Sequence, residues 1–192
     1  MIEYDGKKFG NTEGYLLRDS MGTYQYRQTL QKVKTGEMIR MRAGVFAPVE
    51  SLANTMIDIE KVIPGGTLCM YSAWFHYNLT TQIPSEYCVA IPRKRKIVLP
   101  AFPAFELYYW TDKLFDFGIC KTEIGSYTIQ ITDLERSVCD AIKYRNKIGL
   151  DLSTEILRTY LQRNDRSISR LLDYAKKLRV ESTIKKYLEV SL

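Results

Sequence analysis

Residues Gly22 to Pro48 read GTYQYRQTLQKVKTGEMIRMRAGVFAP, a polar segment, a glycine and an alternating basic segment with no linker between them. Thr23 is a favourable N-cap residue, because its hydroxyl can accept a hydrogen bond from a free backbone N–H of the next turn. Gly36 suits the left-handed residue that commonly ends a helix. The sequence therefore predicts a helix from about Tyr24 to Thr35.

The predicted helix has one apolar stripe and one polar face. Tyr26, Leu30 and Val33 recur at helical spacing, which predicts the buried side. The opposite side is rich in amides and cations and carries no Asp or Glu. Amides and cations are the groups that pair with base edges and phosphates in a DNA major groove. The candidate DNA-binding residues of this helix are Thr23, Tyr24, Gln25, Arg27, Gln28, Gln31 and Lys32.

The segment that follows this helix alternates between apolar and basic residues. Ile39 and Met41 would lie on one side of a strand, with Arg40 and Arg42 on the other. Ala43-Gly44 provides the reversal of a hairpin. The two arginines are therefore candidate phosphate contacts on a basic hairpin.

A second, shorter helix is predicted upstream, with Asn11 or Thr12 as its N-cap and Gly22 in the turn that joins the two helices. Its apolar residues would be Leu16, Leu17 and Met21. Helix, turn, helix and hairpin in this order predict a winged helix-turn-helix in residues 1 to 48. The alternative is an amphipathic helix and a hairpin that only pack on the rest of the protein.

Four consecutive cations, Arg93, Lys94, Arg95 and Lys96, lie between two predicted strands. Such a run most often forms a solvated loop. It would add phosphate contacts, which increase affinity without reading sequence, if the loop lies on the same face as the hairpin. Both interpretations stay open, and the four residues are included among the candidate DNA-binding residues.

Residues 49 to 192 are predicted to fold as a mixed, largely antiparallel sheet followed by helices, which makes the whole chain α+β. The predicted strands are Thr67–Tyr71, Glu86–Ile91, Ile97–Leu99, Phe105–Trp110, Gly118–Glu123 and Tyr127–Ile131. The predicted helices are Ser51–Ile63, Ala73–Leu79 with Ser72 as its cap, one from a Thr132–Glu135 capping box to Gly149, and a C-terminal bundle. Within the bundle, Ser153 would cap Thr154–Arg163, Asn164 or Asp165 would begin a second helix, and Ile184–Val190 would form the last.

Composition limits the partners and the compartment. The chain of 192 residues has a formal net charge of +6 and a pI near 9.0, which favours an acidic partner. No apolar run approaches the roughly 18 to 20 residues of a membrane span, and the N-terminus lacks the apolar core of a signal peptide. We therefore expect a cytoplasmic protein with no membrane partner.

No motif predicts a catalytic, metal or cofactor site. Cysteines 69, 88, 120 and 139 are widely spaced, which is typical of reduced, buried residues, and His76 is the only histidine. Asp133, Glu135 and Asp140 would suit a metal-dependent nuclease. However, a helix start explains the first two, and an ion pair with Arg136 explains the third. We expect a protein that is not an enzyme.

Several stretches resemble the AbiEi antitoxins of abortive-infection toxin-antitoxin systems, and they occur in the family's order. The first runs from Leu16 to Pro48 and contains Gly36-Glu37-Met38-Ile39-Arg40 and Arg42-Ala43-Gly44-Val45-Phe46-Ala47. The others are Ser72-Ala73, Val89-Ala90-Ile91-Pro92, and Ile131-Thr132-Asp133-Leu134-Glu135-Arg136-Ser137-Val138-Cys139-Asp140. The resemblance thus covers most of the chain.

The resemblance implies an antitoxin that binds its own operator in double-stranded DNA, as a monomer or weak dimer, and represses its operon through residues 1 to 48. It also implies that residues 49 to 192 counter a nucleotidyltransferase-like toxin, in systems called type IV because a stable complex is not required. Two alternatives remain, a stand-alone transcriptional regulator and a nuclease that its N-terminal region only targets to nucleic acid.

Overall fold

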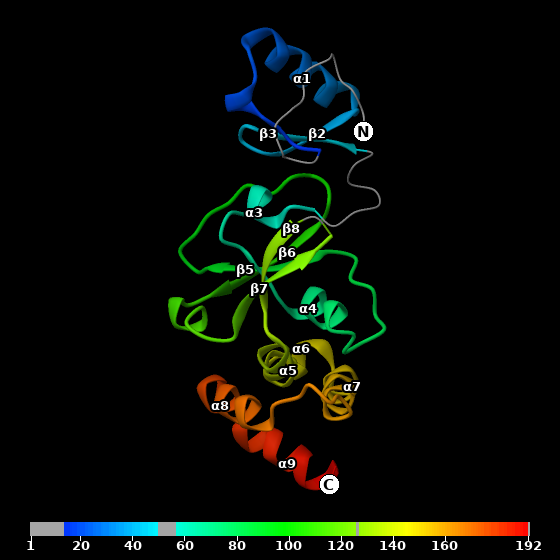
Figure 1. Ribbon diagram of the computed structural model, residues 1–192, viewed down its shortest axis with the longest axis vertical. Coiled ribbons are helices and arrows are strands. Elements are labelled where there is room, and N and C mark those ends of the chain that lie inside the picture. Colours follow the sequence, from blue (N-terminus) through cyan, green and yellow to red (C-terminus); the bar gives the residue numbers. More distant parts are fainter. Residues whose placement is uncertain (1–13, 50–56, 126, 192) are drawn as a thin grey trace.

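The computed structural model describes residues 14–49, 57–125 and 127–191. These residues form an α+β fold with a three-stranded sheet, a five-stranded sheet and helices. Figure 1 shows three layers along the long axis, which are residues 14–49 (the N-terminal module), the five-stranded sheet, and a helical layer that ends at the C-terminus. None of the described helices is long and apolar enough to cross a bilayer.

The N-terminal module consists of one α-helix packed on a small antiparallel sheet. Tyr26, Leu30 and Val33 contact a cluster formed by Met21, Met38 and Phe46, so the predicted apolar stripe is confirmed. The strand order is β1-β3-β2. The elements are β1 (Leu16–Leu17), the 3-10 turn η1 (Arg18–Ser20), α1 (Thr23–Thr35), β2 (Met38–Arg42) and β3 (Val45–Pro48).

The ends of α1 agree only partly with the prediction. Gly36 has a φ of 80° and ends the helix in the left-handed conformation, as predicted. Thr23 is not the N-cap, because Gly22 takes that position and Thr23 is the first helical residue. The backbone N–H of Gly22 donates to Oε1 of Gln25 at 3.2 Å. The Gln25 side chain in the first turn thus provides a hydrogen-bond acceptor for the N-cap residue.

The predicted upstream helix through Leu16, Leu17 and Met21 is wrong within the described residues. Leu16 and Leu17 form β1 and pair with β3, and only the short turn η1 separates β1 from α1. The hairpin offers an open edge, and Leu16 and Leu17 pair with it opposite Phe46 and Val45. The proposed caps Asn11 and Thr12 lie outside the described residues.

The hairpin β2–β3 forms as predicted, with a bulge at Met41. Arg40 lies opposite Phe46 and Arg42 lies opposite Val45, so Met41 is the inserted residue. Successive side chains of a strand point to opposite faces of the sheet. Met38 therefore packs under α1, whereas Ile39 and Met41 belong to a cluster shared with the central sheet.

The central sheet has the strand order β6-β5-β4-β8-β7. It is mixed, as predicted, but the expectation of a largely antiparallel sheet is wrong, because β5–β6 and β4–β8 are parallel while β4–β5 and β7–β8 are antiparallel. The strands are β4 (Thr67–Leu68), β5 (Tyr87–Pro92), β6 (Phe105–Trp110), β7 (Ile119–Ile124) and β8 (Tyr127–Thr132), and the turn η2 (Asp112–Leu114) follows β6.

Residues 93–104 form no strand, so the predicted strand Ile97–Leu99 is wrong. Adjacent parallel strands begin at the same end of a sheet, and the chain must therefore run back along the sheet between β5 and β6. Residues 93–104 (the crossover loop) make this return. In Figure 1 the loop arches over α3 (Ile59–Val62), beneath the N-terminal module.

Two predicted helices of the central layer are shorter or shifted. The helix predicted from Ser51 begins, among the described residues, only at Ile59, because Asp58 is its N-cap and accepts from the N–H of Lys61 at 3.1 Å. Residues 51–56 lie outside the described residues. Helix α4 (Met70–His76) starts earlier than predicted, which also shortens β4, and Ser72 is not its cap. Instead Ser72 Oγ accepts from the N–H of Cys88 at 2.9 Å.

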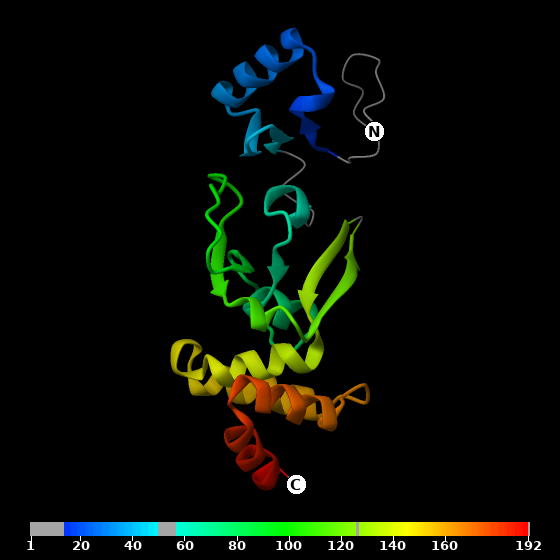
Figure 2. The ribbon, with the colours of Figure 1, turned by 90° about the vertical axis from the view of Figure 1, so that its left-hand side faces the viewer.

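The predicted helical C-terminus is confirmed, and Figure 2 shows its helices stacked beneath the sheet. The predicted helix ending at Gly149 is divided at Tyr144. The helices are α5 (Leu134–Lys143), α6 (Arg145–Ile148), α7 (Leu150–Leu161), α8 (Ile168–Leu178) and α9 (Glu181–Ser191). The predicted starts at Ser153 and at Asn164 or Asp165 are wrong, because α7 begins at Leu150 and Ser167 caps α8.

The predicted capping box of Thr132 and Glu135 is also wrong. Asp133 is the N-cap of α5, and its Oδ1 accepts from the N–H of Arg136 at 2.8 Å. Thr132 Oγ1 instead lies 2.8 Å from Ser137 Oγ. Glu135 points into the helical layer and does not bond the start of its own helix. Its Oε1 instead accepts from the hydroxyl of Tyr160 in α7 and from the N–H of Ser167, the N-cap of α8.

Candidate nucleic-acid interface

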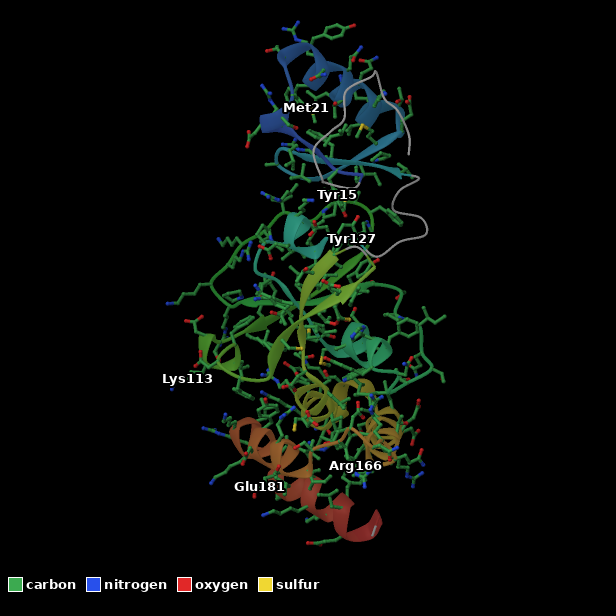
Figure 3. The ribbon with its side chains drawn as sticks, in the orientation of Figure 1. Tyr15, Met21, Lys113, Tyr127, Arg166 and Glu181 are labelled. Atoms are coloured by element: carbon green, nitrogen blue, oxygen red, sulfur yellow. The ribbon has the colours of Figure 1, made fainter. Side chains whose placement is uncertain are left out.

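The outer face of α1 is exposed as the sequence predicts. Tyr24 is 72% exposed, and Thr23, Arg27, Gln28 and Gln31 are exposed as well. The helix carries no acidic residue. Figures 1 and 3 show α1 at the end of the molecule farthest from the C-terminal helices, with side chains extending outward from it. This face (Thr23, Tyr24, Arg27, Gln28 and Gln31) is called the α1 outer face below.

Two further candidate residues of α1 lie at the margin of this face. Gln25 is half-buried, and its side-chain oxygen Oε1 already accepts from the backbone N–H of Gly22. Lys32 is half-buried in the last part of the helix, near Lys34, which is exposed. Sequence periodicity did not single out Lys34, although its position in the last turn of a basic helix could have indicated it.

The hairpin arginines have different surroundings. Arg40 is exposed on β2. Arg42 is also exposed, but its Nε donates to the carbonyl of Lys61 and so joins the hairpin to α3. Lys61 in turn pairs with Asp58 at 3.1 Å and lies over the ring of Tyr15, 5.2 Å from its centroid. Arg42 thus helps to hold the N-terminal module on the central layer.

Arg18 is a cation of the module that sequence reasoning did not select. Its guanidinium lies 4.4 Å from the centroid of the Tyr26 ring, and Nη1 donates to the carbonyl of Met21 at 2.9 Å. Its backbone N–H bonds the carbonyl of Gly44 at 2.7 Å. The side chain lies at the junction of η1, α1 and the hairpin turn, which becomes visible only once β1 is known.

The four cations of the crossover loop are separated from the α1 outer face. Arg93, Lys94 and Lys96 are exposed, whereas Arg95 is half-buried and donates through Nη1 to the carbonyl of Pro64. In Figures 1 and 2 the loop lies on the side of the three-stranded sheet away from α1. The structure therefore places these cations near the hairpin and α3 rather than beside the helix.

The three carboxylates considered for a nuclease have structural partners. Asp140 pairs with Arg136 at 3.0 Å with both side chains buried, which confirms the predicted ion pair. Glu135 Oε1 accepts from the N–H of Ser167 at 2.9 Å. Asp133 Oδ2 accepts from the hydroxyl of Tyr174 at 2.9 Å. The contacts of Glu135 and Asp133 tie α5 to the segment before α8 and to α8.

The cysteines and the histidine resemble buried structural residues. All four thiols are free, and three of them are buried, at positions 69, 88 and 139. Burial raises the pKa of Cys88 to about 11, so this thiol is protonated at neutral pH and a weak nucleophile. His76 is half-buried, its ring centroid lies 4.9 Å from that of Tyr77, and burial lowers its pKa.

A comparison with models of known protein families finds no match, and neither does a comparison with curated protein sequences. The geometry alone therefore defines the candidate interface. It consists of an exposed helix face that combines an aromatic ring, amides and a cation, with an exposed arginine on the adjoining hairpin. Such a face can donate hydrogen bonds to base edges and phosphates.

Proposed function

We propose that this protein is a DNA-binding repressor that acts on its own operon. The observation that carries the proposal is the α1 outer face, which is exposed, rich in donors and free of carboxylates along the whole helix. Its position at one end of the molecule leaves it accessible to a duplex (Figure 1). A net charge of +6 would also favour association with a polyanion.

We interpret the N-terminal module as a reduced winged helix-turn-helix. In this interpretation η1 takes the place of the first helix, α1 is the recognition helix, and β2–β3 is the wing. The helix, the tight turn at Gly22 and the adjoining hairpin support it. A similar fold does not establish a similar function. The proposed function therefore rests on the exposed side chains of α1 and not on the fold of the module.

The antitoxin role rests on the resemblance to the AbiEi family. We propose that residues 49 to 192 counter a nucleotidyltransferase-like toxin in the cytoplasm, without catalysis and without a cofactor. A neighbouring gene for such a toxin would support this role, and its absence would favour the stand-alone regulator. The nuclease alternative is less attractive, because Asp133, Glu135 and Asp140 already stabilise the packing of α5.

Binding titrations with two variants test the DNA-binding role. The probes are the duplex upstream of the protein's own gene and a scrambled duplex, at several salt concentrations. Gln28→Ala is expected to lower affinity for the upstream duplex by about 1 to 3 kcal/mol and to change affinity for scrambled DNA much less. Arg40→Ala is expected to weaken both and to reduce the salt slope by about one.

Lys113→Ala is the matched control, because Lys113 is an exposed cation that Figure 3 places in the central layer, far from α1. It is expected to leave both affinities unchanged. Equal losses of affinity on both duplexes for Gln28→Ala would show that α1 does not distinguish DNA sequences. If the unaltered protein bound neither duplex, the proposed DNA-binding function would be wrong.

A second experiment separates the antitoxin role from DNA binding. The full chain carrying Gln28→Ala and Arg40→Ala is expressed with the toxin from an unrelated promoter. Growth is expected to be rescued as well as by the unaltered chain, because the altered residues lie outside residues 49 to 192. Loss of rescue with a folded variant would contradict the assignment of toxin neutralisation to that region.

A further inference from the structure

Two cysteines lie opposite each other where the pairing of β4 with β5 ends. Leu68 lies opposite Val89 in this antiparallel register, so the next opposed residues are Cys69 and Cys88. The N–H of Cys69 donates to the carbonyl of Cys88 at 2.9 Å, which shows that the ladder reaches this pair. Opposed residues that share a ladder hydrogen bond have Cα atoms about 5.5 Å apart, and this separation suits a disulfide.

Both thiols point to the same side of the sheet. Leu68 and Val89 belong to the hydrophobic cluster shared with the N-terminal module, whereas Cys69 and Cys88 belong to the cluster formed with the C-terminal helices. This division follows from the alternation of side chains along each strand. Burial raises the pKa of the Cys69 thiol, and the Cys88 thiol raises it further. The two sulfur atoms are therefore close enough to interact.

The backbone holds this pair less tightly than a pair in the middle of a sheet. Cys69 is the N-cap of α4, and Met70 after it has a left-handed φ of 49°, so the chain leaves the sheet at this point. The N–H of Cys88 donates to Oγ of Ser72 at 2.9 Å, and the carbonyl of Cys69 accepts from Ala73 at 3.4 Å. Because these two groups bond outside the ladder, the cysteines can approach each other without breaking a second strand–strand hydrogen bond.

Cys88 is the thiol nearer to solvent. Its Sγ donates to Oε2 of Glu106 at 3.6 Å. Glu106 is exposed and lies on β6, at one end of the strand order of the sheet. Cys69 is 0% exposed and lies deeper. A small oxidant that passes beside Glu106 therefore meets Cys88 first.

We propose that Cys69 and Cys88 form an intramolecular disulfide when hydrogen peroxide oxidises the protein. In the first step the Cys88 sulfur attacks one peroxide oxygen and the O–O bond breaks. The leaving hydroxide takes up the thiol proton as water, and Cys88 becomes a sulfenic acid. In the second step the Cys69 sulfur attacks the Cys88 sulfur, and the hydroxyl group leaves with the Cys69 proton as a second water. The two thiols lose two electrons in total, and these reduce one peroxide to two waters.

The bond is expected to form slowly and to stabilise the protein. Burial raises the pKa of both thiols, so they are protonated at neutral pH and react slowly. A disulfide carries no charge and therefore suits this buried position. It closes the segment from Cys69 to Cys88, which contains α4 and a loop whose Ile83 is 79% exposed. Closing a segment restricts the unfolded chain more than the folded one, so oxidation favours the folded state.

Peptide mapping of the full chain after oxidation tests the bond. Hydrogen peroxide is added to reduced, native Cys120→Ser protein, because half-buried Cys120 would otherwise compete for it. Free thiols are then blocked in denaturant, and peptides are separated without reductant. A peptide that joins Cys69 to Cys88 is expected, and Cys69→Ala and Cys88→Ala are each expected to abolish it. Cys139→Ala is the matched control, because it removes another buried thiol, and the linked peptide should remain. Free Cys69 and Cys88 after treatment, or a link to Cys139, would overturn the proposal.

Urea unfolding of the same samples provides a second readout. Oxidation is expected to raise the urea midpoint of the Cys120→Ser protein and of its Cys139→Ala variant, and dithiothreitol should reverse the rise. The Cys69→Ala variant should show no such shift. A link that forms only after unfolding, or a native link that leaves the midpoint unchanged, would contradict the pairing of these thiols in the folded protein. These measurements contain no DNA, so their outcome is separate from that of the proposed repressor function.

Discussion

Arg136 shows how much structure one buried charge can organise. Its guanidinium lies between the rings of Trp110 and Phe117, at 4.5 and 4.6 Å from their centroids, and it pairs with Asp140. Nη1 donates to the carbonyls of Leu114 and Phe117 at 2.9 and 3.1 Å. The side chain therefore joins α5 to the segment between β6 and β7.

Removing the partner of this charge is predicted to be costly. Asp140→Ala leaves Arg136 buried without its carboxylate, and loss of one member of a buried pair typically costs about 3 to 5 kcal/mol. Urea unfolding measures the change. Asp165→Ala is the control, because Asp165 pairs with Arg163 at 2.7 Å but is 61% exposed, and little change is expected there. Equal losses for both variants would contradict the role of burial.

Thiol chemistry provides a second prediction at the scale of the residue. Cys69, Cys88 and Cys139 are buried, and burial raises the pKa of each. Cys120 is only half-buried. Alkylation of the native protein followed by mass spectrometry is expected to modify Cys120 first, and all four only after unfolding. Early modification of Cys88 would show that its surroundings open readily.

At the scale of the element, two helix ends use the left-handed conformation with different residues. Gly36 ends α1 with a φ of 80°, and Arg179 ends α8 with a φ of 61°. The left-handed region is accessible to glycine without the steric cost that Cβ imposes on other residues. Of these two helices, α1 therefore ends with a residue suited to the left-handed conformation, and α8 does not.

This difference predicts opposite effects of two substitutions. Gly36→Ala is expected to destabilise the protein, and Arg179→Gly to stabilise it, each by about 1 kcal/mol. Thermal unfolding measures both. Arg179→Ala controls for loss of the charge, since it keeps the Cβ in the left-handed region. A stabilisation by Arg179→Ala equal to that by Arg179→Gly would attribute the effect to charge rather than to backbone conformation.

The sequence predicts well those elements that are determined by a pattern of residues close together in the chain. The stripe of α1, the reversal at Ala43-Gly44 and the strand Phe105–Trp110 depend on neighbours within a few residues, and all three are present. The strand at Leu16–Leu17 depends on pairing with distant β3, and the crossover loop depends on the parallel pairing of β5 with β6. No periodicity within these segments contains that information.

The same distinction applies to the candidate interface. Exposure of Tyr24, Gln28 and Arg40 follows from the alternation of polar and apolar residues, and the structure agrees. The bonds from Arg42 to Lys61 and from Arg95 to Pro64 join segments that are far apart in sequence. Their acceptors are backbone carbonyls, which no side-chain pattern reveals. Sequence thus predicts which cations are exposed but not which ones also hold the layers together.

At the scale of the whole molecule, the hairpin β2–β3 lies between two hydrophobic clusters. Met38 packs with Met21 and Phe46 beneath α1. Met41 belongs to the cluster that contains Ile57 and other residues of the central layer. Tyr15 accepts a hydrogen bond from the N–H of Asp58 at 2.9 Å, and its ring lies 6.3 Å from that of Tyr127 (Figure 3). The N-terminal module thus shares a core with the central sheet.

The two methionines of β2 provide a test of whether these layers unfold together. Met41→Ala and Met38→Ala remove the same side chain from sites that are 0% and 5% exposed, and each is expected to cost about 2 to 5 kcal/mol. Because the Met41 site is shared, its loss should lower hydrogen-exchange protection in α1 and in β4, β5 and β8 alike. The Met38 site is local, so its loss should lower protection chiefly in α1 and the hairpin. If Met41→Ala instead opens only residues 14–49 and leaves the central strands protected, those residues unfold as an independent unit. The boundary predicted at residue 48 would then separate two folding units, and the contacts of Tyr15 and Arg42 with the central layer would add little to stability.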